Sequence, residues 1–264
     1  IKIFDTIKPF NKTIEVTSDK SLSIRVILLA SQAIGVSTIS NLLESEDVLN
    51  AVRSIKKLGI KCKKIGNQYK ILGYGLNGFE IKKNTTIDAG NSGTFARLIL
   101  GLLVKSKKTV KIVGDKSLSR RDFSRITEPL KKFGTNIKSK TNSLPVEILG
   151  TEFLRPINYF ETRGSAQCKS AIMLAALNTP GTTIIKAKKS RNHTEILFKY
   201  LKLPINIKSK GNFDFIEVTG LKQFNAFDYI VPGDISSSAF FIDLIAFNTS
   251  SDSSKLVIVD IPIA

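Results

Sequence analysis

The chain has 264 residues, of which 42% are hydrophobic and 23% charged, a composition typical of a globular protein and not of a disordered one. Its two cysteines, Cys62 and Cys168, lie far apart without clustered cysteine or histidine partners, which argues against a disulfide framework or a zinc site. No apolar run reaches the roughly 18 residues that a membrane span needs, and residues 1–12 do not resemble a signal peptide. We therefore expect a cytoplasmic protein.

The charge is strongly unbalanced, since 40 basic residues face 22 acidic ones and the formal net charge is +18. A field of this sign favours anionic partners, either nucleic acid or phosphorylated small molecules. A solvated, lysine-rich surface is an equally good explanation. Aromatic residues do not alternate with the lysines as a base-stacking surface requires. Charge alone does not choose among these alternatives.

A repeat of about 70 residues organises the chain. Three segments run from a small residue into an apolar stretch with a basic residue four positions later, and they follow one another at equal spacing: Ser21 and Arg25, Gly93 and Arg97, Ser165 and Lys169. The apolar stretches at 25–34, 97–106 and 169–178 predict helices, and the β-branched runs at 36–40, 109–114 and 182–187 predict the strands that follow.

The second half of each unit repeats as well. Amphipathic helices are predicted around 48–58, 126–133 and 194–203, and each leads into a hairpin whose second strand ends in glycine, at Gly73, Gly150 and Gly220. Each unit therefore reads as β-α-β-α-β-β, and three units occupy 17–228. A fourth begins at Val231 and stops halfway. Because half a unit cannot cover its own apolar helix face, we expect the natural protein to continue beyond Ala264.

The repeated helix beginnings are candidate anion sites. A helix N-terminus presents free backbone N–H groups and a partial positive charge. Small residues there let a ligand approach the backbone closely, and a basic residue one turn later adds a charged donor. Ordinary helix caps are the simpler explanation for any single helix. Three such helix beginnings at equal spacing instead favour one shared binding face.

Six motifs, in order along the chain, resemble those of the EPSP synthase (3-phosphoshikimate 1-carboxyvinyltransferase) family of enolpyruvyl transferases. They are SDKSLSIR at 18–25, DAGNSGTFARLILGLL at 88–103, GDKSLSRRDFSRITEPLKKFG at 114–134, GSAQCKSAIMLAAL at 164–177, SRNHTE at 190–195 and PGDISSSAFF at 232–241. The set spans nearly the whole chain, which makes the resemblance specific.

The resemblance implies an α/β (α+β) fold of two domains, each built from three βαβαββ units as an inside-out α/β barrel, with the active site in the cleft between them. Residues 17–230 would be one complete domain, and 1–16 and 231–264 incomplete pieces of the other. The implied reaction transfers the enolpyruvyl group of phosphoenolpyruvate to the 5-hydroxyl of shikimate 3-phosphate by addition and elimination, in aromatic amino-acid biosynthesis. It needs no metal or organic cofactor, and the complete protein is expected to be a monomer.

The resemblance also implies site residues. Those matched to shikimate 3-phosphate binding are Lys20, Ser21, Arg25, Ser165, Ala166, Gln167 and Arg191. Those matched to phosphoenolpyruvate binding are Lys20, Asn91, Gly93, Arg121 and Gln167, so that Lys20 and Gln167 would touch both ligands. Arg120 leaves an uncertainty of one residue in the choice of Arg121. Arg97 would brace the site from one turn inside its helix.

Some positions depart from the family pattern. Ile24 stands where a polar residue is usual, and Asp122 stands where proline is common. The family's catalytic carboxylates are expected beyond Ala264, so the general acid and base stay unassigned and the chain alone is expected to be inactive. His193 is a tempting base, but we favour a place at a helix start within a variant capping box at 192–195.

Three rival interpretations remain. A UDP-N-acetylglucosamine enolpyruvyl transferase shares the fold and the phosphoenolpyruvate chemistry, but its motifs differ from SAQCKSA and SRNHTE. A basic, non-enzymatic nucleic-acid-binding repeat protein would account for the charge and would bind with a steep salt dependence. A degenerate, non-catalytic remnant is the third.

Overall fold

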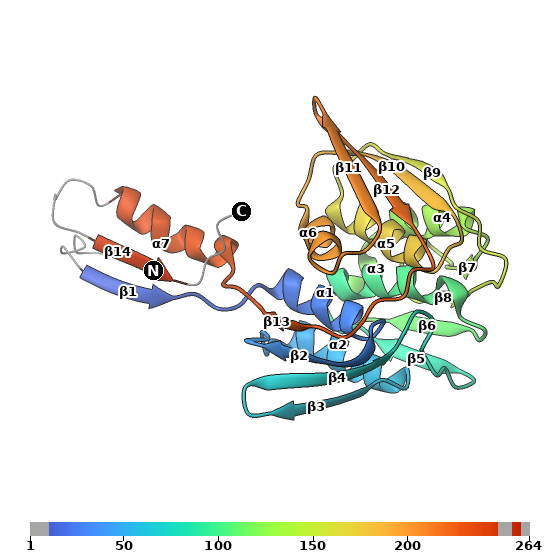
Figure 1. The fold of residues 1–264 in the computed structure, drawn as a ribbon, viewed down its shortest axis with the longest axis horizontal. Coiled ribbons are helices and arrows are strands. Elements are labelled where there is room, and N and C mark those ends of the chain that lie inside the picture. The colour runs from blue at the N-terminus through green and yellow to red at the C-terminus, as the bar shows by residue number, and fades with distance from the viewer. Residues whose placement is uncertain (1–10, 248–254, 260–264) are drawn as a thin grey trace.

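The computed structural model describes residues 11–247 and 255–259. Within these residues the strands form three four-stranded sheets and one two-stranded sheet. The three larger sheets surround a group of helices, and the two-stranded sheet packs with one helix apart from them (Figure 1). The α/β class and the repeated units are therefore as predicted.

Each of the three units contributes two helices and a set of strands. The first contains α1 (Lys20–Ala30), β2 (Ile34–Ser40), α2 (Glu46–Lys57), β3 (Lys61–Ile65) and β4 (Gln68–Tyr74). The second contains β5 (Thr85–Asp88), α3 (Gly93–Leu102), β6 (Val110–Val113), α4 (Ser124–Lys132), β7 (Asn136–Lys138) and β8 (Val146–Leu149), with short 3₁₀ helices η1 (Leu103–Lys105) and η2 (Leu118–Arg120). The third contains β9 (Asn158–Glu161), α5 (Ala166–Leu177), β10 (Thr182–Lys188), α6 (His193–Tyr200), β11 (Ile205–Lys210) and β12 (Phe213–Thr219).

The sheets share one topology. The second and third have the orders β5-β6-β8-β7 and β9-β10-β12-β11, with the first pair parallel and the others antiparallel. The first has the order β13-β2-β4-β3, and β13 (Asp228–Ile230) pairs in parallel with β2. The prediction that each unit supplies all of its own strands is therefore wrong for the first unit. Its outer strand, β13, follows the third unit in the chain and covers the otherwise unpaired edge of β2 in the first sheet.

Three helices, α1, α3 and α5, form the interior. Nearly every residue of each is buried, from Leu22 to Ala30 in the first and from Cys168 to Leu177 in the third. A helix that is apolar on all sides can be stable only inside the protein, because no face of it is suited to water. The outer helices α2, α4 and α6 instead bury one stripe each, as their amphipathic patterns predict.

Glycines bring the strands and helices into close contact at equivalent places. A Cβ on Gly73 would overlap the backbone oxygens of Ala30 and Ala33 at the end of α1. A Cβ on Gly220 would likewise overlap backbone oxygens at the end of α5. A Cβ on Gly150 would overlap backbone atoms of Val104, Lys105 and Ser106, at the end of η1 in the second unit. The glycine that ends each hairpin in the sequence is therefore required where the hairpin crosses the end of the central helix.

Replacement of Gly220 by alanine should lower the free energy of unfolding by about 1–3 kcal/mol, because the backbone oxygens of Thr179 and Ala176 cannot move aside easily. Urea unfolding measures this loss. Gly211→Ala is the control, since Gly211 has φ of 56° but nothing within 4 Å of its Cβ position, so only backbone strain of about 1 kcal/mol applies there. Equal losses in the two variants would contradict the packing argument.

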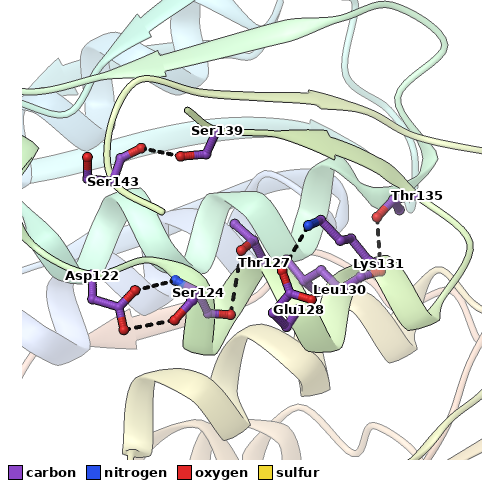
Figure 2. A network of polar contacts seen from close by, with 9 residues as sticks. All are labelled: Asp122, Ser124, Thr127, Glu128, Leu130, Lys131, Thr135, Ser139 and Ser143. Carbon is purple, nitrogen blue, oxygen red and sulfur yellow. Dashed lines mark hydrogen bonds and ion pairs between the residues drawn. The ribbon is translucent and has the colours of Figure 1, made fainter. Parts of the chain in front are cut away.

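Asp122, the residue that departs from the family pattern, organises the start of α4. Its carboxylate accepts hydrogen bonds from the backbone N–H and the hydroxyl of Ser124, both at 2.8 Å (Figure 2). These bonds hold the pKa of Asp122 below its usual value. A carboxylate at a helix start satisfies a free N–H group and favours the helix dipole. Asp122, which directly precedes the N-cap residue Phe123, thus fixes the first residue of the helix.

The remaining described elements pack separately. β1 (Asn11–Glu15) pairs in parallel with β14 (Lys255–Val259), and α7 (Ile235–Phe247) lies against them (Figure 1). Phe240 of α7 is 79% exposed and Ile242 is 50% exposed, because no described element covers this apolar face of the helix. Among the described residues no helix is both long and apolar enough to cross a membrane.

Candidate functional site

The beginnings of the three interior helices meet at one cavity of about 330 Å³, here called the helix-start cavity. Lys20 and Ser21 of α1, Thr94 of α3, and Ala166 and Gln167 of α5 line it. α1 is capped by Asp19, whose carboxylate accepts from the N–H of Leu22 at 2.7 Å. The remaining N–H groups and positive helix ends therefore converge on one volume, as an anion site requires.

Two arginines complete the cationic wall of the cavity. Arg25 is 4% exposed and donates from Nη1 to the backbone oxygen of Ser21 at 3.0 Å. Arg191 also lines the cavity and donates to the hydroxyl of Ser236 at 3.2 Å. Burial lowers the pKa of Arg25 to about 10, with a smaller lowering from Arg191 and opposition from Glu195 and Asp19. Arg25 thus stays charged at neutral pH, and a bound anion would relieve its repulsion from Arg191.

Lys20 lies at the rim of the cavity. Its ammonium group forms an ion pair with Asp47 at 3.0 Å, with the lysine side chain 51% exposed. Exposed pairs of this kind contribute little to stability and exchange partners readily. The side chain is therefore available to turn toward a ligand in the cavity.

The loop before α5 is fixed by a buried carboxylate. Glu161, which is 4% exposed, accepts hydrogen bonds from the backbone N–H groups of Arg163 and Ser165 at 3.1 and 3.0 Å. Ser165 in turn caps α5 by accepting from the N–H of Cys168 at 3.2 Å. The Ser165–Ala166–Gln167 segment is therefore held in place from behind. The sequence analysis missed Glu161.

A second group of cations lies beside the helix-start cavity, around Gly93. Arg121 donates to the amide oxygen of Asn91 at 3.2 Å, and Asn91 donates to Asp115 at 2.7 Å. A Cβ on Gly93 would lie 3.1 Å from Nη1 of Arg121 and 3.3 Å from Nη1 of Arg97. The structure thus brings together three of the five residues matched to phosphoenolpyruvate binding by sequence, Asn91, Gly93 and Arg121.

Arg97 joins the two groups. It donates to the side-chain oxygen of Gln167 at 2.5 Å, and Gln167 donates to the hydroxyl of Thr94 at 2.9 Å. Burial lowers the pKa of Arg97 to about 10, and Arg125 and Arg121 lower it further by repulsion. Its Nε has no hydrogen-bond partner among the described residues. This is a cluster of cations without enough carboxylates, which an anion would stabilise.

Lys169 behaves differently from the basic residues at the equivalent positions of the other two units. Its ammonium group is fully buried and forms an ion pair with Glu195 at 2.6 Å. The sequence interpretation, in which all three repeated basic residues add donors to the helix starts, is therefore wrong for Lys169. Its charge is neutralised inside the protein, because α6 supplies a carboxylate there.

His193 begins α6, as predicted, but the capping box proposed for 192–195 is wrong. The Asn192 side chain makes no capping hydrogen bond, and Glu195 binds Lys169 instead of a helix-start N–H group. Burial holds the pKa of His193 below its usual value, so the imidazole is neutral at pH 7. His193 is not among the residues that line the helix-start cavity.

Four further residues of the cavity were not identified from the sequence as site residues: Asp19, Thr94, Asp234 and Ser236. Each lies within one of the recognised motifs, and Asp19 and Thr94 directly adjoin the identified residues Lys20 and Gly93. The segment that carries Asp234 pairs with the segment before α1. The N–H of Asp234 donates to the backbone oxygen of Thr17, and an isolated β-bridge joins Ser18 to Gly233. Only the fold brings this late segment beside α1. In the described residues no group of three or more potential metal-ligating side chains was found.

Comparisons with known proteins agree with the motifs. A family model described as EPSP synthase (3-phosphoshikimate 1-carboxyvinyltransferase) matches residues 4–250. The chain belongs to this family. A 3-phosphoshikimate 1-carboxyvinyltransferase from Ruthia magnifica subsp. Calyptogena magnifica is 41% identical over 240 residues, and one from Streptococcus pyogenes serotype M1 is 39% identical over 237. Each alignment covers 89% of this chain and 54% of the relative, so the chain spans about half the length of these curated relatives.

Solved structures show the same fold. An EPSP synthase from Acinetobacter baumannii superimposes with a TM-score of 0.85 at 31% identity, covering 97% of this chain and 58% of that one. A second structure from the same organism gives a TM-score of 0.80 at 33% identity, covering 89% of this chain and 52% of that one. The enolpyruvyl transferase-like fold that the family resemblance implied is therefore confirmed.

Replacement of Gly93 by alanine should change the free energy of unfolding by less than about 1 kcal/mol, because the Cβ would meet only the movable ends of Arg97 and Arg121. Gly101→Ala in the same helix is the matched comparison, since its Cβ would overlap the backbone oxygen of Ala171 in α5. We expect that variant to lose about 1–3 kcal/mol in urea unfolding. A larger loss for Gly93→Ala would mean that this glycine is required for packing.

Removal of one partner of the buried Lys169–Glu195 pair should be costly. Lys169→Met leaves the carboxylate of Glu195 buried and uncompensated, with an expected loss of about 3–5 kcal/mol in unfolding free energy. The double variant Lys169→Met/Glu195→Leu should lose less than Lys169→Met alone, since both charges of the pair are removed together. Denaturant unfolding of both variants measures this. A double variant less stable than the single one would contradict the explanation.

Proposed function

We propose that this chain supplies one wall of a site that transfers the enolpyruvyl group of phosphoenolpyruvate to the 5-hydroxyl of shikimate 3-phosphate. The observation that carries the proposal is the convergence of three helix starts and two buried arginines, Arg25 and Arg97, on two adjoining groups of cationic residues. Family membership supports the same reaction. The chain covers only 54% of its curated relatives, so the proposal concerns the whole protein to which these residues contribute.

In this proposal the helix-start cavity binds shikimate 3-phosphate. The charged guanidinium of Arg25 lines the cavity and can donate to an anionic group, while Arg191 and Lys20 add charge from the other sides. The free N–H groups at the start of α5 suit a phosphate, with Ser165 and Gln167 beside them. The cavity volume, about 330 Å³, is of the size that takes one small molecule.

Phosphoenolpyruvate would bind in the neighbouring cluster of Arg97, Arg121 and Asn91. Gly93 leaves room there, because a side chain at this position would extend toward both guanidinium groups. Gln167 contacts Arg97 and also lines the helix-start cavity, so it can touch both ligands. The ligands would then lie side by side, which is the arrangement that a group transfer between them needs.

The role of these residues in the reaction is binding and electrostatic stabilisation. Preorganised cations around the phosphoryl group stabilise the charge that develops as phosphate leaves. No general acid or base is assigned to this chain. We also propose that residues 17–230 make one complete domain and that 1–16 and 231–264 belong to the other. The three sheets closed by β13, and the separate packing of β1, α7 and β14, support this division.

The 264-residue chain should bind shikimate 3-phosphate saturably, and Arg25→Ala should weaken the binding at least about ten-fold by removal of a charged hydrogen-bond donor. Titration calorimetry measures both. Arg155→Ala, an exposed arginine outside the site, is the control and should bind like the unchanged chain. Tight duplex DNA binding that falls steeply with salt, without saturable binding of shikimate 3-phosphate, would instead favour a nucleic-acid-binding protein.

A further inference from the structure

The guanidinium of Arg25 is held from behind by hydroxyl groups of two other helices. Its Nε donates to the hydroxyl of Thr194 in α6 at 2.8 Å, and its Nη2 donates to the hydroxyl of Ser170 in α5 at 3.2 Å. Thr194 also donates to Ser170 at 2.7 Å, which joins the two supports. Three helices that are distant in the sequence therefore meet at one side chain.

These contacts leave the guanidinium with one orientation. Thr194 and Ser170 are both about 1% exposed, so water does not compete for the two bonds. Because the guanidinium group is planar, the two hydrogen bonds that Nε and Nη2 donate also fix the direction of Nη1. Nη1 contacts Ser21, a residue of the helix-start cavity. The outer edge of the guanidinium is therefore turned toward the cavity before any ligand arrives.

The charge of Arg25 is supported by the same part of α6. Glu195 follows Thr194 directly and is buried beside Lys169. Its carboxylate opposes the lowering of the pKa of Arg25 that burial causes. α6 thus provides both a hydrogen-bond acceptor and a negative charge behind the arginine.

We propose that Thr194 and Ser170 are positioning residues for the anionic substrate, which act through Arg25 by fixing the direction of its guanidinium group. This inference rests on the proposed function, since it takes Arg25 to be a ligand for shikimate 3-phosphate. It assigns a role in substrate binding to two residues that touch no part of the helix-start cavity. Preorganisation of this kind improves affinity because the cost of ordering the side chain is met on folding.

A merely structural role makes a different prediction. If the two hydroxyl groups only satisfy a buried arginine, their removal lowers stability and changes ligand affinity equally whether or not Arg25 is present. If they act through Arg25, their effect on ligand affinity disappears when the guanidinium group of Arg25 is removed. A double-mutant cycle separates these two cases.

The test measures the affinity of the 264-residue chain for shikimate 3-phosphate by calorimetry in four variants and two backgrounds. Thr194→Val, which keeps the shape and removes the hydroxyl, should weaken binding about five- to ten-fold, and Thr194→Ser should restore it to within about two-fold. Ser170→Ala should weaken binding less, because its bond to Arg25 is longer. Thr183→Val is the matched control, since Thr183 is fully buried but its hydroxyl has no partner among the described residues.

The second background is Arg25→Lys, in which the side chain keeps its positive charge but loses the planar guanidinium group. There Thr194→Val should change the affinity by less than about two-fold. Urea unfolding checks that each variant is folded, and if Thr194→Val does not fold, Ser170→Ala takes its place in the cycle. An undiminished effect in the Arg25→Lys background, or no effect in the unchanged background, would overturn the inference.

The result also separates this inference from the proposed function. Absence of saturable binding to the unchanged chain would contradict the proposed function itself. Binding that is lost in Arg25→Ala but retained at full strength in Thr194→Val and Ser170→Ala would leave the proposed function in place and refute the positioning role.

Discussion

Close packing of the interior helices is the constraint on which the site depends. α3 and α5 touch through Gly101, where no side chain fits, and each hairpin crosses the end of its central helix through a glycine. This packing sets the relative positions of the three helix beginnings. Because their free N–H groups and positive ends point to the same place, the fold itself provides the geometry that an anion site requires before any arginine is considered. Arg25, Arg97 and Arg121 then add charge to it.

Much of this arrangement could be predicted from the sequence, because each unit is encoded locally. The apolar stretches, the amphipathic helices and the hairpins ending in glycine recur at even spacing, so helices and strands follow from periodicity. The residues matched to the two ligands also gather as expected in two adjoining groups, although their roles as ligands stay predictions. Arg121 lies 30 residues from Asn91 in the chain, but its side chain meets Asn91 and Gly93 in the fold.

The parts that could not be predicted depend on contacts between distant segments. β13 completes the first sheet from the other end of the chain, and Asp234 reaches the cavity from beyond it. Lys169 matches Arg25 and Arg97 in the repeat, yet Glu195 neutralises it, and no local pattern distinguishes the three. The role of Glu161 behind the loop before α5 also depends on the fold. A single glutamate in a strand does not indicate that its carboxylate will accept hydrogen bonds from the backbone of that loop.

The central claim is that three helix beginnings form one anion site. Titration of the isotope-labelled chain with shikimate 3-phosphate, followed through backbone amide resonances, tests it most directly. The account predicts that the amides of Ser21, Thr94 and Gln167 shift together along a single saturation curve. Shifts confined to one helix start, or scattered over the outer hairpins, would contradict it.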